Sequence, residues 1–218
     1  MEKSISDRLM KFYARNDKSV TINAAQGHFA TSQSHINYYI DVTRIKVRVS
    51  EAKEAAKFLR ERMVNRIESI DSIVCLDETQ VLGAFLGEEI EKGGFITNNA
   101  HETEYVVCPE ENSIHQFMFR ENNRLAICGK NVIILVDSIS TGTTVKRMIE
   151  CIRYYGGKVC GIASIFSTVD EVYGVKAYTI FDEEDLPGYQ AYSPTDCPMC
   201  QKRIPIEAMV NGYGYAKL

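Results

Sequence analysis

Apolar residues fill every position from Val132 to Val136, and four of these five side chains are β-branched. Such a run predicts a strand that is buried on both faces of a parallel sheet. Beyond the polar residues 137–144, apolar side chains return at the i, i+3, i+4 and i+7 positions of a helix: Val145, Met148, Ile149 and Ile152. The pattern therefore predicts a strand, a polar turn and a helix as one continuous unit.

Other segments show the same kinds of spacing. The clearest helix follows Ser50, a good N-cap, and keeps its apolar residues on one face as far as Ile67. Further elements are predicted as strands at 72–76, 104–109, 159–166 and 178–181, a helix opened by 81–86 after a turn at 77–80, a hairpin joining 113–119 to 125–128, and an acidic turn at 182–185. Strands that alternate with helices indicate an α/β fold with a central parallel sheet.

The amino-terminal part shows weaker patterns. Residues 4–15 alternate polar and apolar side chains at helical spacing, with Ile5, Leu9 and Phe12 on one side, which predicts a short amphipathic helix. Residues 16–35 carry many small and polar side chains, which predicts mostly loop.

The polar turn after the 132–136 strand is a candidate phosphate loop. A hydroxyl-rich turn that opens a helix directs free backbone N–H groups, hydroxyls and the positive end of the helix dipole at one place, and this favours a bound phosphate. Asp137 at its start is suited to accept hydrogen bonds from sugar hydroxyls. The candidate residues are Asp137, Ser138, Ser140, Thr141, Gly142, Thr143 and Thr144. The alternative is an ordinary strand followed by an N-capped helix.

Composition narrows the classes of function. The chain has 218 residues, with 25 basic and 29 acidic side chains and a net charge of −4. This balance suggests neither nucleic acid nor an anionic membrane as a partner. No apolar run approaches the roughly 18 to 20 residues that span a bilayer, and no apolar signal core follows the first residues, so we expect a cytoplasmic protein. Seven cysteines, an odd number spread along the chain, fit reduced thiols rather than a secreted disulfide framework.

The turn lacks the Gly-x-x-x-x-Gly-Lys and Gly-x-Gly-x-x-Gly patterns of other nucleotide-binding loops. It resembles the signature of type I phosphoribosyltransferases, in which an apolar strand, two acids and two variable residues precede Thr-Gly-x-Thr. Asp137 matches the first acid and 141–144 the phosphate loop, while Ser138 replaces the second acid. In that family the loop holds the 5-phosphate of 5-phosphoribosyl 1-pyrophosphate (PRPP), and the acids hold its ribose hydroxyls.

The resemblance extends from Gly27 to Ile206 and is closest to orotate phosphoribosyltransferases. It implies one phosphoribosyltransferase-like domain over 1–218, with an amino-terminal hood at 1–45, a core at 46–182 and a carboxyl-terminal tail at 183–218. It also implies Mg²⁺ as cofactor, PRPP and a nucleobase as substrates, orotate the first candidate within pyrimidine nucleotide synthesis, and a homodimer. Without the resemblance, the chain could be an unrelated doubly wound α/β protein.

The hood is indicated by Gly27-His28-Phe29 and by a strand that carries tyrosine. The resemblance implies that Phe29, Ser32 and Tyr39 contact the base. The alternative is that Phe29, Tyr38 and Tyr39 only pack a small β-layer.

Several positions depart from the orotate phosphoribosyltransferase pattern. Asp77, Glu78 and Thr79 occupy the place of a glycine-rich pyrophosphate loop, where two carboxylates would repel pyrophosphate unless Mg²⁺ lies between them. Cys108 and Pro109 stand where a basic pair is usual, and His115, Arg120 and Arg124 are the nearest substitutes for the basic residues of the mobile loop. Glu171 replaces the arginine that grips the orotate carboxylate. No catalytic residue is assigned, and a binding or regulatory protein that kept the sugar-phosphate pocket is the second hypothesis.

The tail carries Cys197-Pro198-Met199-Cys200, and a Cys-Pro-x-Cys sequence also occurs in one branch of the resembling family. Zinc needs four ligands, and no second Cys or His pair at the usual spacing is present, so no metal site is predicted unless two subunits share one. The pair is expected to form a turn that docks the tail.

Overall fold

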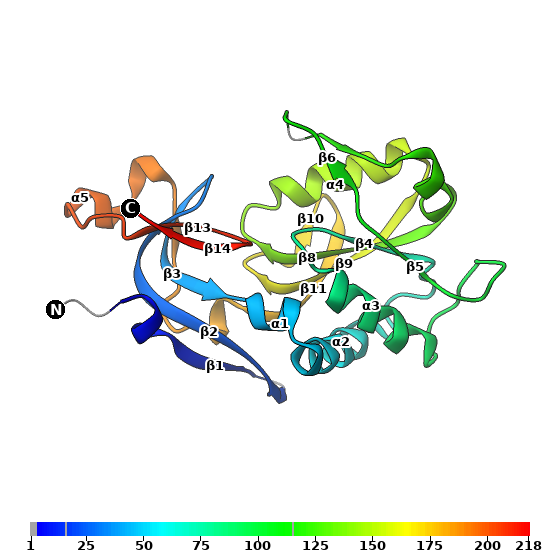
Figure 1. The fold of residues 1–218 in the computed structure, drawn as a ribbon, viewed down its shortest axis with the longest axis horizontal. Helices are drawn as coiled ribbons and strands as arrows, with labels where there is room; N and C mark the ends of the chain where they lie inside the picture. The colour runs from blue at the N-terminus through cyan, green and yellow to red at the C-terminus, as the bar shows by residue number, and fades with distance from the viewer. Residues whose placement is uncertain (1–3, 16, 115) are drawn as a thin grey trace. The chain divides into compact units, whose positions relative to one another are not determined.

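The computed structural model describes residues 4–15, 17–114 and 116–218. The chain divides into two compact units, one formed by Ile45–Ile180 and the other by Met1–Arg44 together with Phe181–Leu218 (Figure 1). The divisions at 44/45 and 180/181 fall close to the hood, core and tail boundaries predicted at 45/46 and 182/183. The tail belongs to the same unit as the hood.

The unit of residues 45–180 is built on a central six-stranded sheet with the order β10-β11-β9-β8-β4-β5. The strands β9, β8, β4 and β5 pair in parallel with one another along this order. In chain order the strands are β4 (Ser72–Cys75), β5 (Tyr105–Val107), β8 (Asn131–Ile139), β9 (Lys158–Ser167), β10 (Glu171–Val172) and β11 (Val175–Asp182). The predicted α/β class with a central parallel sheet is confirmed, and the apolar run at 132–136 lies in its interior strand β8.

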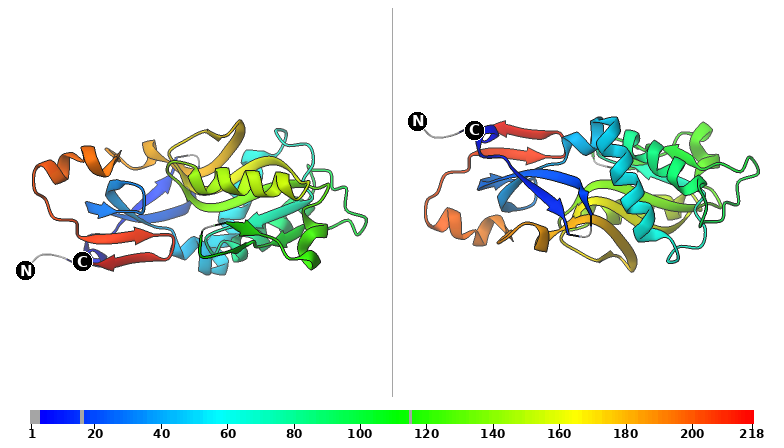
Figure 2. Two further views of the ribbon diagram at one scale, coloured as in Figure 1. Left: turned by 90° about the horizontal axis from the view of Figure 1, so that it is seen from above. Right: turned by 90° about the horizontal axis from the view of Figure 1, so that it is seen from below.

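Helices cover both faces of this sheet. Figure 2 shows α4 in front of the sheet in one view, and α2 and α3 in front of it in the opposite view. Their bounds are α1 (Thr43–Val47), α2 (Val49–Met63), α3 (Gln80–Glu91) and α4 (Thr143–Tyr154). The predicted apolar stripe of α4 is buried against β8, where Val145, Met148, Ile149 and Ile152 are at most 1% exposed. Burial of each such side chain contributes about 1.5–3 kcal/mol, which fixes α4 at the end of β8.

The other unit is a second sheet that both ends of the chain build. Its order is β12-β3-β2-β13-β14, and β1 also pairs with β2. The elements are η1 (Ser6–Arg8), β1 (Met10–Ala14), β2 (Asp17–Ala30), β3 (His35–Asp41), η3 (Glu183–Asp185), β12 (Ala191–Tyr192), η4 (Pro194–Asp196), α5 (Pro198–Gln201), β13 (Ala208–Asn211) and β14 (Gly214–Lys217). Strand β13 from the tail runs parallel to β2 from the hood.

Two predictions for the amino-terminal part are wrong. Residues 10–14 form a strand rather than the second half of a helix, and residues 17–30 form the long strand β2 rather than a loop. Their spacing was ambiguous because a short segment can bury alternate side chains or helical positions equally well. Pairing between the two segments, from Met10 opposite Ala24 to Ala14 opposite Asp17, decides for strands.

Two boundaries in the core unit also differ from the prediction. Helix α2 begins at Val49 with Arg48 as its N-cap, so Ser50 lies inside the helix. The predicted hairpin of 113–119 with 125–128 is instead formed by β6 (Glu110–Glu111) and β7 (Phe117–Met118). Residues 121–126 form the 3₁₀ helix η2 (Glu121–Ala126).

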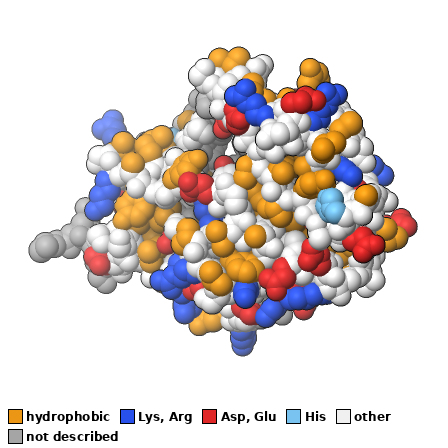
Figure 3. Space-filling model, turned by 45° about the vertical axis from the view of Figure 1, so that its right-hand side comes forward, with side chains coloured by type: hydrophobic (Ala, Val, Ile, Leu, Met, Phe, Trp, Pro, Cys, Tyr) orange, Lys and Arg blue, Asp and Glu red, His pale blue; other side chains and the backbone are white. Residues whose placement is uncertain are grey.

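Acidic and basic side chains are both spread over the face shown in Figure 3, among apolar and polar ones. This mixed surface agrees with the small net charge of −4. No helix within residues 4–15, 17–114 and 116–218 has both the length and the apolar character needed to span a lipid bilayer.

Candidate functional site

The candidate phosphate loop lies where the carboxyl end of β8 passes into α4. Gly142 is the N-cap of α4 and has φ of +72°, a left-handed conformation that glycine adopts without strain. The first helical hydrogen bond runs from Lys146 N–H to the Gly142 carbonyl at 2.8 Å. On the other side, the Thr168 hydroxyl donates to the Ser140 carbonyl at 2.7 Å, which ties the loop to the end of β9.

Gly142 is also required by the space around it. A Cβ built at this position would lie 2.9 Å from Cγ2 of Val172, closer than real Cβ contacts come. The turn therefore needs glycine for both its backbone angle and its packing, and this keeps the loop close to the sheet.

Most of the predicted loop side chains point to solvent. Ser138, Ser140, Thr141 and Thr143 are exposed, and Thr144 is half-buried. The Thr141 and Thr143 hydroxyls lie 3.0 Å apart. Together with the first N–H groups of α4 and the positive end of its dipole, these hydroxyls form a cradle suited to a phosphate dianion.

Asp137 differs from its neighbours because it is buried. Its carboxylate is 2% exposed, and it lies 3.2 Å from Nζ of Lys46, which is also 2% exposed. Lys46 also donates to the Asp77 carbonyl at 2.9 Å, and the Ser138 hydroxyl donates to the second oxygen of Asp137 at 3.1 Å. Burial raises the pKa of Asp137, and the nearby Lys46 ammonium opposes that rise.

Lys46 is a residue of the candidate site that the sequence did not reveal. It lies 91 positions before Asp137, in the short helix α1, and no motif around it marks it as a partner. Only the fold brings the two side chains together.

The loop at 77–79 joins β4 to α3 beside this ion pair. Asp77 and Glu78 both have positive φ, +50° and +60°, which is uncommon for residues other than glycine, asparagine or aspartate. Thr79 is fully buried, and its hydroxyl donates to the Leu76 and Leu135 carbonyls at 2.7 and 3.2 Å. Its side chain thus closes the turn, which leaves Asp77 and Glu78 as the groups available to a ligand.

Burial and the nearby Asp137 carboxylate raise the pKa of Asp77 from 3.8 to about 6, and Lys46 opposes this rise. The folded chain then binds a proton at Asp77 that the unfolded chain has released, so this residue reduces stability as the pH rises from 4 to 6. We expect Asp77→Asn to increase the free energy of unfolding by up to about 3 kcal/mol above pH 6, and to have no effect below pH 4.

Urea unfolding of both proteins between pH 4 and 8 measures this difference. Asparagine tolerates the left-handed backbone at position 77. Glu78→Gln is the matched control, since Glu78 is exposed and has the same backbone conformation. If the stability of Asp77→Asn and of the native chain changes with pH in parallel, the pKa of Asp77 is not raised as described.

Comparison with known proteins identifies the fold on which this site is built. No protein-family model matches the chain. The chain is 28% identical over 194 residues to an orotate phosphoribosyltransferase of Thermotoga maritima, covering 84% of this chain and 89% of the relative. It also aligns with the crystal structure of Mycobacterium tuberculosis orotate phosphoribosyltransferase, in complex with Fe(III) dicitrate, with a TM-score of 0.53 at 14% identity over 76% of this chain and 93% of that one. The chain has the type I phosphoribosyltransferase fold.

The same fold also aligns with the adenine phosphoribosyltransferase of Thermoanaerobacter pseudethanolicus. The TM-score is 0.51 at 12% identity, over 82% of this chain and 97% of that one. The predicted resemblance to the type I phosphoribosyltransferase fold is therefore confirmed. Enzymes named for a pyrimidine and for a purine base both share it.

In this phosphoribosyltransferase fold, two of the three predicted hood residues are packed inside their own unit. Phe29 is fully buried and Tyr39 is 5% exposed, with their ring centroids 6.1 Å apart. Tyr39 also contacts Tyr215 of β14, at a centroid distance of 5.1 Å. This arrangement is the one that the packing alternative predicts. Ser32 is exposed in the turn between β2 and β3.

Arg120 and Arg124, two of the predicted substitutes for the basic residues of a phosphoribosyltransferase mobile loop, are both paired with acidic side chains. Arg120 donates two hydrogen bonds to Glu110, at 2.8 and 2.7 Å, and Arg124 lies 3.4 Å from Glu121. His115 lies outside the described residues. In the place of the basic pair, Cys108 accepts a hydrogen bond from the Cys75 thiol, which lowers the pKa of Cys108 to about 7.

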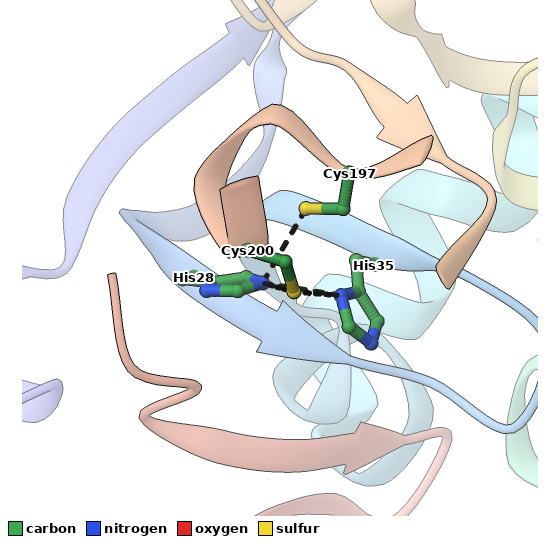
Figure 4. Close-up of side chains that lie close together, drawn as sticks. All are labelled: His28, His35, Cys197 and Cys200. Atoms are coloured by element: carbon green, nitrogen blue, oxygen red, sulfur yellow. Dashed lines mark hydrogen bonds between the residues drawn. The ribbon is translucent and has the colours of Figure 1, made fainter. Parts of the chain in front are cut away.

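The sequence suggested that the tail cysteines stand alone, but the structure places other possible metal ligands beside them. His28 of β2 and His35 of β3 lie beside Cys197 and Cys200, and the four ligand atoms are within 4.8 Å of one another (Figure 4). No second Cys or His pair follows at the usual spacing, and for that reason no metal site was predicted; the fold nevertheless brings two histidines to the cysteine pair. Antiparallel pairing of β2 with β3 brings the two histidines together although six residues separate them in the chain, a spacing that common zinc motifs do not use.

Proposed function

We propose that the protein transfers the phosphoribosyl group of PRPP to a nitrogen of a nucleobase, with orotate the first candidate. The observation that supports this most is the cradle at 140–144, because its exposed hydroxyls and the start of α4 lie at the carboxyl end of an interior parallel strand. Ligands of open α/β sheets bind at this edge.

In the proposed complex, the backbone and hydroxyls of Thr141, Thr143 and Thr144 hold the 5-phosphate. Ser138 is exposed and hydrogen-bonded to Asp137, so it is placed to meet the ribose hydroxyls directly. The Asp137 carboxylate accepts the hydrogen bond of the Ser138 hydroxyl and orients it, and the Lys46 ammonium opposes the rise that burial causes in the pKa of Asp137. Asp137 thus acts on the sugar through Ser138, where the sequence suggested direct contact.

The reaction breaks the bond from ribose C1 to the pyrophosphate oxygen and forms a bond from C1 to a base nitrogen, which releases its proton. The chain's main contribution is to hold the sugar phosphate and the base in register. Pyrophosphate leaves beside Asp77 and Glu78, and these carboxylates disfavour a bare polyanion at this place.

Mg²⁺ fits this site as an ion carried by the substrate. Among residues 4–15, 17–114 and 116–218, three or more Asp, Glu, His or Cys ligands gather only around His28, so Asp77 and Glu78 do not form a closed oxygen cage. Mg²⁺ usually keeps several waters and binds through one or two carboxylates plus substrate phosphates, and Glu78 is exposed enough to supply one. The ion supplies charge neutralisation of the leaving pyrophosphate.

Release of pyrophosphate from PRPP tests the proposal, with orotate and a panel of other pyrimidine and purine bases each added in the presence of Mg²⁺. We expect turnover with at least one base. Because Glu171 is exposed and acidic where orotate-specific enzymes carry arginine, the panel has to extend beyond orotate. No turnover with any base would contradict a transferase.

A second candidate function is binding of a sugar phosphate without transfer. The buried Lys46–Asp137 pair favours it, because both groups are at most 2% exposed and neither reaches solvent at the loop. PRPP binding with no turnover on the full panel is the result that this candidate predicts.

A further inference from the structure

Four side chains converge at one place in the unit formed by the two chain ends. Nε2 of His28 lies 3.2 Å from Nδ1 of His35 and 3.5 Å from Sγ of Cys197. Sγ of Cys200 lies 3.7 Å from Nε2 of His28 and 3.2 Å from Nδ1 of His35. Figure 4 shows all four groups directed at a common centre.

These separations match the edges of a tetrahedral zinc site. With bonds of about 2.0–2.1 Å to nitrogen and 2.3 Å to sulfur, ligand atoms around zinc are about 3.4 Å apart for two nitrogens and about 3.6 Å for nitrogen and sulfur. Four of the separations run from 3.2 to 3.7 Å. The other two pairs of ligand atoms lie within 4.8 Å of one another.

The histidines are positioned by the turn between β2 and β3. Ala30 pairs with His35 and Phe29 with Ile36, which places His28 and His35 on neighbouring strands. The turn itself is closed by a hydrogen bond from Thr31 N–H to the Ser34 carbonyl at 2.8 Å. His35 is therefore held by regular backbone pairing before any metal binds, and His28 lies next to this paired stretch, in the irregular part of β2 between Gln26 and Phe29.

The cysteines are positioned by α5, a single helical turn. Cys197 is its N-cap, Pro198 starts it, and the Gln201 N–H donates to the Cys197 carbonyl at 3.1 Å. The following residues return to the hairpin, where Glu207 N–H donates to the His28 carbonyl at 2.8 Å. The tail is thus held against β3 before the cluster, where Tyr192 pairs with His35, and against β2 after it.

A second layer of contacts sets the tautomer of His28. Its Nδ1 lies 2.8 Å from the Ile204 carbonyl, which can only accept a hydrogen bond. Nδ1 must therefore carry the proton, and Nε2 faces the cluster with a free lone pair. Zinc-binding histidines are oriented in this way by a carbonyl or carboxylate on the other nitrogen.

We infer that His28, His35, Cys197 and Cys200 bind one structural Zn²⁺ ion. Two imidazoles and two thiolates suit zinc, and four protein ligands leave no open position for a substrate. Both cysteines are free thiols, so they are available as ligands. The ion would join the hairpin near residue 30 to the tail near residue 200, and would stabilise a unit built from the two ends of the chain.

The metal content of the full-length chain, purified under reducing conditions from cells supplied with zinc, tests this inference. Mass spectrometry of the metal should find about one zinc per chain. Exchange for Co²⁺ should give the visible and charge-transfer absorption of a tetrahedral thiolate site. Chelation should lower the melting temperature of the chain. These readouts do not depend on phosphoribosyl transfer.

Variants test whether the zinc is bound by this cluster or by other cysteines and histidines. Cys200→Ser and His35→Ala should lose the zinc, whereas His35→Cys should keep it because sulfur replaces nitrogen. Cys128→Ser is the matched control, since Cys128 is also an exposed free thiol and lies outside the cluster. If Cys200→Ser does not fold, the Co²⁺ spectra of the native chain and His35→Cys decide. Absence of zinc from the native chain, before and after incubation with it, would overturn the inference, as would equal zinc in the native chain and His35→Ala.

Discussion

Replacement of Lys46 by methionine should lower the free energy of unfolding by about 3–5 kcal/mol at pH 7, because it leaves the buried Asp137 carboxylate without its positive partner. Both residues are 2% exposed, and Nζ of Lys46 lies 3.2 Å from the Asp137 carboxylate. Burial raises the pKa of Asp137, and removal of Lys46 should raise it further. The folded variant then holds a proton that the unfolded chain releases, so its loss of stability should grow as the pH rises. Urea unfolding at pH 5, 7 and 8 measures both effects.

Two further variants test whether the loss of stability comes from the buried ion pair. Lys57→Met is the control, because Lys57 pairs with Glu54 on the exposed surface of α2, and its removal should change stability little. Lys46→Met combined with Asp137→Asn should recover most of the loss, since no buried charge remains. Equal stability of Lys46→Met and Lys57→Met would show that the ion pair is not buried as described.

Gly142→Ala should weaken binding of PRPP or ribose 5-phosphate at least about tenfold, which corresponds to about 1.4 kcal/mol. Its Cβ would lie 2.9 Å from Cγ2 of Val172, and alanine at a φ of +72° is strained by a further 1–2 kcal/mol or so. The loop must move to accommodate the methyl group, and this displaces the N–H groups and hydroxyls that hold the phosphate. Calorimetric titration compares the affinities.

Gly129→Ala is a close control for this substitution. Gly129 also has φ of +72°, but a Cβ there meets nothing within 4 Å, so alanine introduces the backbone strain without the contact. It should reduce stability and leave ligand binding unchanged. The double variant Gly142→Ala with Val172→Ala should regain part of the affinity. If Gly142→Ala binds the ligand with native affinity, the loop is not the phosphate site.

The core of the fold was predictable because its signals are local. The strand at 132–136, the glycine turn and the apolar stripe of α4 follow one another within a short segment, and each has a pattern that one structure satisfies. The exposed hydroxyls at 140–143 were predicted for the same reason. Gly142 was identified from the motif. Any larger residue there would place its Cβ too close to Val172, which explains why only glycine fits.

The remaining features depend on contacts between distant segments. Strand β2 alternates apolar and polar residues only from Val20 to Ala24, and the small and polar residues on either side of this stretch favoured a loop. The whole strand is stabilised by pairing with β1, β3 and β13. Lys46 meets Asp137 across 91 positions, and His28 meets Cys197 across 169. A single sequence does not reveal such pairs, because their spacing reflects the topology and not a local period.

The structure also changes the meaning of two motifs. Asp137 matched the acid of a ribose-binding motif, yet its burial beside Lys46 leaves Ser138 as the exposed group. The Cys-x-x-Cys sequence was incomplete as a metal site until the β2–β3 hairpin supplied two histidines. In both cases the side chains within reach, and not the sequence motif, determine the chemistry.

The loop at 140–144 is proposed to bind the phosphate of a phosphoribosyl compound. Isothermal titration of the native chain with PRPP, with and without Mg²⁺, measures this binding. We expect saturable binding of one PRPP per chain, and competition by ribose 5-phosphate. Absence of PRPP binding under both conditions, or binding that ribose 5-phosphate does not reduce, would contradict the claim.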